Sequence, residues 1–111
     1  VVQGVATDLG GIGYSGIGYR TADVRVVPLA KKEGAKVIPA EAKYAYSGEY
    51  PLARFLYVYV NFKPGSDLDP LRKEFVKYIF SKQGQEVVIK DGYLPVSARI
   101  ADEALKSVGI K

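Results

Sequence analysis

The stretch that decides the fold is Leu52-Ala53-Arg54-Phe55-Leu56-Tyr57-Val58-Tyr59-Val60-Asn61-Phe62. Over residues 55–60 aromatic side chains alternate with aliphatic ones, so an extended chain has an aromatic face and an aliphatic face. A strand that is apolar on both faces is typical of the interior of a sheet covered on both sides. We therefore predict that residues 55–60 form an interior strand with other strands on both sides.

A helical pattern follows this strand. Asp69 can cap the helix, with Pro70 at its first position. Gly84 interrupts the pattern, which then continues to a stop at Gly92. The apolar residues predicted to share one face of this helix are Leu71, Phe75, Tyr78 and Ile79.

A last helix is predicted from Ser97, which can cap it, to a stop at Gly109. Its spacing predicts four residues facing inward: Ile100, Ala104, Leu105 and Val108.

Before residue 52 the sequence patterns that predict helices and strands are shorter. Residues 1–8 have the apolar spacing of a helix end, and residues 41–46 form a second short helical pattern that ends at Ser47-Gly48. Strands are predicted at residues 12–14 and 24–29. Alternating strands and helices with one buried strand indicate the α/β class.

Composition excludes several kinds of chemistry. The chain has no Cys and no His, so it offers no disulfide, no thiolate nucleophile and no Ser-His-Asp triad. The 16 Lys and Arg are dispersed, and the longest basic run is Lys31-Lys32, so no nucleic-acid partner is predicted. The carboxylates are scattered as well. We predict no catalytic residue, no metal site and no cofactor, and hence no enzyme.

The spacing Gly11-x-Gly13-x-x-Gly16 matches a dinucleotide-binding motif by letter. That motif requires a hydrophobic strand before it and a helix after it, and neither is predicted here. We interpret these glycines as allowing a tight turn.

The stretch from Ser47 to Arg54 is the strongest candidate in the sequence for a binding site or a hinge. Arg54 stands where an apolar strand begins, so it could pair with an anion or anchor a hinge. The alternative, which we favour, is an exposed or ion-paired arginine at the end of a strand.

Four motifs together resemble periplasmic phosphate-binding proteins, the solute receptors of ABC-type phosphate importers. The motifs are the Gly-Ile-Gly-Tyr of residues 11–14, the Ser-Gly-Glu-Tyr-Pro-Leu-Ala-Arg stretch with its strand at 47–60, the helix at 75–85, and Lys-Asp-Gly-Tyr-Leu-Pro-Val at 90–96. The resemblance covers almost the whole chain, in the same order and spacing.

The resemblance implies part of a type II periplasmic-binding-protein fold, which has two lobes, each a three-layer αβα sandwich. Residues 1–46 would be a portion of the second lobe, residues 47–60 the hinge and return strand, and residues 61–111 the carboxy-terminal portion of the first lobe. The chain would then be a carboxy-terminal fragment of a longer receptor. Its signal peptide would be absent and its location would be the bacterial periplasm.

The family's phosphate cradle, a Ser/Thr-Gly-Ser/Thr loop at a helix N-terminus, has no counterpart in this sequence. Ser47-Gly48 is followed by Glu49, whose charge would repel phosphate. Phosphate-binding residues are therefore unassigned, with Ser47, Gly48 and Arg54 as weak candidates. The parent receptor would bind inorganic phosphate and deliver it to a membrane permease, and this chain would supply scaffold and hinge.

A different function stays open, in which the chain is a stand-alone structural or interaction module that binds no phosphate. In either case strand edges without partners predict self-association or pairing with the missing amino-terminal half.

Overall fold

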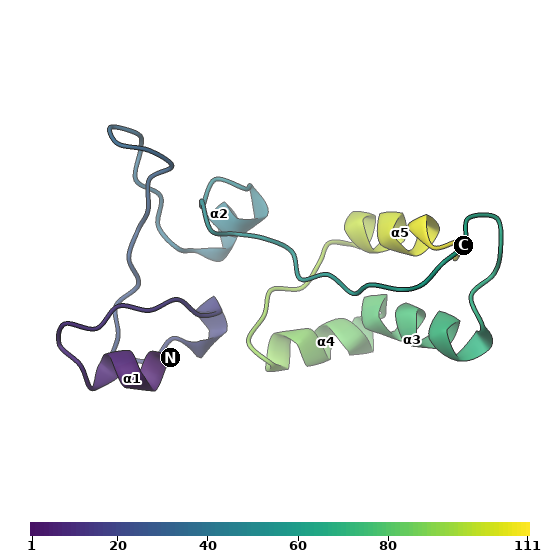
Figure 1. Cartoon of the computed structure of the whole chain (residues 1–111), viewed down its shortest axis with the longest axis horizontal. Coiled ribbons are helices and arrows are strands. Elements are labelled where there is room, and N and C mark those ends of the chain that lie inside the picture. The colour runs from purple at the N-terminus through teal and green to yellow at the C-terminus, as the bar shows by residue number, and fades with distance from the viewer. The chain divides into compact units, whose positions relative to one another are not determined.

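The computed structural model describes residues 1–111, which divide into two compact units, Val1–Tyr57 (unit 1) and Val58–Lys111 (unit 2). Neither unit contains a β-strand, and no helix is both long and apolar enough to cross a membrane. The division between the units lies inside the predicted return strand 47–60, and the assignment of residues to lobes stays a prediction. The helices in chain order are α1 (Val2–Ala6), the 3-10 helix η1 (Ile17–Tyr19), α2 (Ala42–Tyr46), α3 (Pro70–Phe80), α4 (Lys82–Lys90) and α5 (Ala98–Ser107) (Figure 1).

Unit 1 consists mainly of turns and extended backbone around two short helices. The predicted helical segments at both ends are confirmed as α1 and α2, and α2 ends as expected at Ser47-Gly48, where Gly48 has a φ of 73°. Leu29 and Ile38 exchange two backbone hydrogen bonds of 3.0 and 2.8 Å in an isolated antiparallel bridge. Ile38 is the one buried apolar side chain of this unit, with an exposure of 6%.

Unit 2 has a small apolar core between helices. Leu68, Val76 and Ile110 are buried, with exposures of 7%, 4% and 3%. In Figure 1, α5 lies alongside α3, and α4 continues from the end of α3. The partly buried residues packed against the core are Val60, Phe62, Phe80, Leu105 and Val108.

The caps of α3 and α5 are those that the sequence predicts, whereas the cap of α4 by Ser81 was not predicted. Asp69 accepts a hydrogen bond from the Arg72 backbone N–H at 3.1 Å and pairs with the Arg72 guanidinium. These contacts, the backbone hydrogen bond first, hold the pKa of Asp69 below its ordinary value. Ser97 caps α5, and Gly109, with a φ of 75°, ends it as predicted. Leu105 and Val108 face the core, in agreement with the predicted inward face.

Gly84 marks a close approach between α3 and α4. Ser81, between the two helices, donates to the Tyr78 carbonyl at 2.7 Å and accepts from the Gly84 N–H at 3.1 Å. A Cβ at Gly84 would lie 2.0 Å from the Tyr78 carbonyl oxygen and 2.8 Å from that of Ile79. The interruption that the sequence indicates at this glycine is therefore a junction at which only a residue without a side chain fits.

Gln85 ties this junction to the segment that leads into α5. Its amide nitrogen donates to the Ile79 carbonyl at 2.8 Å, and its amide oxygen accepts from the Val96 N–H at 2.9 Å. Both contacts are partly buried, so one side chain links the end of α3, the start of α4 and the residue that precedes the cap of α5.

The prediction of an interior strand at residues 55–60 is wrong for this structure. The segment is extended but unpaired in any sheet, and Leu56 and Val58 are 62% and 60% exposed. The predicted strands at 12–14 and 24–29 are also absent, apart from the bridge at Leu29. A strand exists only within a sheet, and the structure contains no sheet to which these residues belong.

The predicted inward face of α3 is wrong in most of its members. Leu71, Phe75 and Tyr78 are exposed, whereas Val76 is the residue that enters the core. The core formed with Leu68, Ile110 and residues of α5 lies on the side of α3 that carries Val76.

The Gly84→Ala substitution should destabilise the chain, because the added methyl collides with backbone carbonyls that side-chain movement cannot relieve. We expect a loss of about 1–3 kcal/mol, as for other overpacked sites, measured as a lower midpoint of urea denaturation. Gly4→Ala is the matched control, since nothing lies within 4 Å of a Cβ at Gly4 and the residue is helical. Equal midpoints for the two variants would contradict the close approach.

Removal of residues 97–111 should abolish cooperative melting of unit 2, because it deletes Ile110 and the α5 residues that cover the core. Circular dichroism at 222 nm would follow the transition. Deletion of the exposed Lys111 alone is the control and should leave the melting curve unchanged. A chain that ends at Val96 and melts like the full chain would show that α5 is dispensable.

Candidate functional site

The three weak candidates for phosphate binding lie around the end of α2. The Ser47 hydroxyl lies 2.9 Å from a carboxylate oxygen of Glu49 and donates a hydrogen bond to it. Gly48 occupies the turn, and Arg54 donates to the carbonyl of the next residue, Phe55, at 3.5 Å. The Ser47 hydroxyl is thus engaged with a negative charge, and no hydrogen bond joins Ser47 to Arg54. Their role in phosphate binding stays a prediction.

The nearest cation on α2 is also engaged. Lys43 pairs with the Glu41 carboxylate at 3.0 Å and lies 4.7 Å from the centre of the Tyr44 ring. The hydrogen bond to Glu41, with the charge of that carboxylate, raises the pKa of Lys43 above its ordinary value. The Lys43 ammonium is therefore already paired with a carboxylate, which makes it less available to bind an anion.

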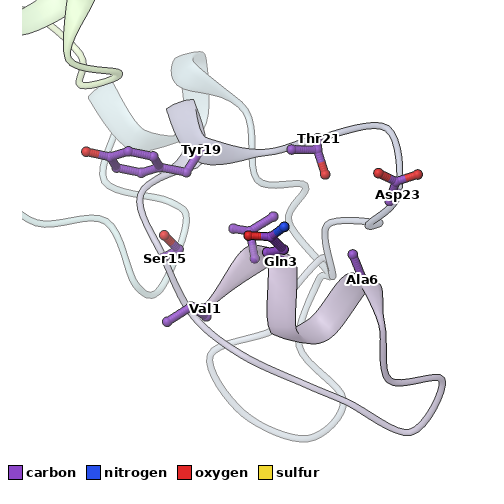
Figure 2. Close-up of a pocket in the computed structure, with 8 residues that line it drawn as sticks. Val1, Gln3, Ala6, Ser15, Tyr19, Thr21 and Asp23 are labelled. Atoms are coloured by element: carbon purple, nitrogen blue, oxygen red, sulfur yellow. The ribbon is translucent and has the colours of Figure 1, made fainter.

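A depression of about 450 Å³ lies beside α1 in unit 1. Figure 2 shows the Gln3 amide at its centre, with Tyr19 on one side and Thr21 and Asp23 on the other. The side chains that line this depression are mostly exposed. Among them only Asp23 is charged, through its carboxylate. No sequence pattern indicated this depression, because its lining consists of ordinary polar and apolar residues from separate segments. Amides, hydroxyls and one carboxylate make a poor receptor for phosphate, which needs positive charge or several converging N–H donors.

No cluster of three or more Asp, Glu, His or Cys residues is placed to hold a metal ion. The remaining ion pairs are exposed pairs within single helices, such as Arg99 with Glu103 and Lys106 with Asp102, both at 2.6 Å. Such pairs stabilise helices by i,i+4 contacts and need no functional explanation.

Comparison with known proteins indicates the family of this chain, which the geometry of the candidate sites does not. Residues 1–83 match the PBP superfamily domain. The phosphate-binding protein PstS of Pseudomonas aeruginosa is 56% identical over 110 residues, which are 99% of this chain and 34% of that protein. The phosphate-binding protein PstS 2 of Streptococcus agalactiae is 34% identical over 95% of the chain and 33% of its own length. The protein SphX of Synechocystis is 33% identical over 86% of the chain and 29% of its own length.

The chain thus spans about a third of the length of the curated relatives that it matches. The superfamily match includes all of unit 1 and extends through α3 into the start of α4, where the Gly84 junction begins. Because that match takes in well over half of the residues, the chain belongs to the PBP (periplasmic-binding-protein) superfamily.

Proposed function

We propose that this chain functions as part of a periplasmic phosphate-binding receptor, which captures inorganic phosphate and passes it to an ABC-type permease in the membrane. The observation that carries the proposal is the 56% identity with the Pseudomonas phosphate-binding protein PstS, sustained over 99% of this chain. Identity at this level extends over both units and is not confined to one short motif. It therefore supports a shared fold and a shared role.

In this proposal the chain supplies scaffold and hinge and makes no chemical change in its ligand. Residues 1–46 contribute to the second lobe, residues 47–60 cross between lobes, and residues 61–111 complete the first lobe as its carboxy-terminal part. The sheets of the three-layer αβα lobes then need strands from the portion of the receptor that this chain does not span. The exposed apolar side chains of residues 55–59 support this assignment, since an interior strand is apolar on both sides.

The phosphate contacts themselves are proposed to come from that other portion. In this chain the Ser47 hydroxyl is engaged with Glu49, and the depression beside α1 carries a carboxylate. Neither offers the converging N–H and hydroxyl donors that bind phosphate at helix ends. The chain therefore acts on phosphate binding through lobe closure rather than through direct contact.

A chimera tests the receptor role. In it, this chain replaces its counterpart in the Pseudomonas phosphate-binding protein PstS. We expect the chimera to bind phosphate with a Kd within about tenfold of that of the Pseudomonas protein, measured by isothermal titration calorimetry. A cooperatively folded chimera without phosphate binding would contradict the proposed function and favour a module that binds no phosphate.

The 111-residue chain by itself should bind no phosphate, because the contacts that we assign to the other portion are absent from it. Calorimetry with phosphate up to about 1 mM, a weak-binding limit, should give no saturable heat. In the chimera, the double substitution of Ser47 and Arg54 by alanine should leave the Kd within a factor of about three. A larger loss, without a change in melting temperature, would place one of these residues in the phosphate site.

A further inference from the structure

Tyr50 joins three segments of unit 1 at the point where the proposed hinge begins. Its backbone N–H donates to the Tyr44 carbonyl in α2 at 3.1 Å, and its own carbonyl accepts from the Ala53 N–H at 3.1 Å. Its hydroxyl donates to the Val27 carbonyl at 3.4 Å, across 23 positions of the sequence. Tyr50 therefore connects α2, the turn at residues 50–53 and the extended segment at residues 24–29.

The carbonyl that receives the Tyr50 hydroxyl lies next to the antiparallel bridge of unit 1. Val27 is separated only by Pro28 from Leu29, which exchanges two backbone hydrogen bonds with Ile38. Pro28 restricts the backbone between them, because its ring fixes φ. The hydroxyl of Tyr50 thus binds a carbonyl whose position depends on a bridge that is anchored by a buried side chain, Ile38.

A second contact places the turn after α2 beside the same bridge. Glu49, the residue before Tyr50, lines a hollow of about 230 Å³ together with Ile38. The Tyr50 side chain itself is partly buried. The turn therefore lies against the bridge at two neighbouring residues, through the flank of Glu49 and through the hydroxyl of Tyr50.

Tyr50 differs in this respect from the polar residues around it. The Ser47 hydroxyl donates to Glu49, and Arg54 donates to the carbonyl of the next residue, so these two contacts stay within residues 47–55. The hydroxyl of Tyr50 leaves that stretch. Pro51 follows directly and restricts both its own φ and the backbone of Tyr50, so the orientation of Tyr50 is passed on to the residues that follow.

We propose that Tyr50 is a positioning residue of the hinge, which fixes the direction in which residues 51–60 leave unit 1 and thereby sets phosphate affinity without touching phosphate. The inference rests on the proposed function, in which residues 47–60 cross between lobes. The apparent Kd of a receptor depends on the fraction of molecules that are able to close around the ligand. When the start of the crossing segment is loosened, the lobes adopt orientations that cannot close, and the Kd rises.

The test removes the hydroxyl in the chimera described above and keeps the ring. We expect Tyr50→Phe to raise the Kd for inorganic phosphate about 3- to 10-fold by isothermal titration calorimetry, the value of one hydrogen bond. The melting temperature should fall by no more than about 4 °C. Tyr14→Phe is the matched control, because the Tyr14 side chain is 88% exposed, and it should leave both quantities unchanged.

Two further measurements separate positioning from general stability. Tyr50→para-aminophenylalanine restores an N–H donor at the same position of the ring, and it should return the Kd to within about twofold of that of the unsubstituted chimera. In the 111-residue chain, Tyr50→Phe should speed hydrogen exchange of the Ala53 amide about 3- to 10-fold, because that amide donates to the Tyr50 carbonyl.

Three results would overturn the positioning role. The first is a Kd for Tyr50→Phe within about twofold of the unsubstituted chimera, whatever the melting temperature. The second is a weaker Kd that para-aminophenylalanine does not restore, and the third is unchanged exchange at Ala53. An unsubstituted chimera that binds no phosphate would instead reject the proposed function, and the effect of Tyr50 on affinity with it. Failure of the positioning role alone leaves phosphate binding by the unsubstituted chimera intact, so the two failures are distinguishable.

Discussion

The missing side chain of Gly84 is the constraint on which unit 2 depends. It allows the backbone of α4 to approach the last carbonyls of α3, where a Cβ would lie 2.0 Å from the Tyr78 oxygen. That approach places Gln85 so that its amide reaches both Ile79 and Val96. Val96 in turn fixes the start of α5, and α5 brings the end of the chain back to α3, where Ile110 completes the core. The side of α3 that faces this core carries Val76, whereas Leu71, Phe75 and Tyr78 are exposed.

The local features of the fold follow from the sequence, because they arise from interactions within a few residues. Asp69 and Ser97 cap the helices for which their side chains predict a cap, and Gly48 and Gly109 end helices in the left-handed region. Each of these is a contact between neighbours in the chain, which a single sequence contains in full.

The pairing of strands and the choice of the buried helix face depend on residues far apart in the chain, and the sequence pattern alone does not predict them. The alternation in residues 55–60 describes a strand with neighbours on both sides, but a strand exists only where another segment offers backbone N–H and carbonyl groups. The face of α3 is a related case. Its periodicity groups Leu71, Phe75 and Tyr78 on one face and predicts that they are buried, whereas the core of this chain contains Val76 instead. The sequence pattern therefore describes surfaces suited to burial, and the structure shows which of them this chain covers.

This distinction also explains why the candidate site could not be found among the polar residues. A phosphate site needs donors that converge from several segments, whereas Ser47, Gly48 and Arg54 follow one another along a single turn and extended stretch. In that stretch the only charge near the serine hydroxyl is the carboxylate that accepts its hydrogen bond. Since a two-lobe receptor closes around its ligand, the residues that hold each lobe together influence affinity without touching the anion. Under the proposed function, one portion of such a receptor can therefore share high identity with the family while the contacts to phosphate come from another portion.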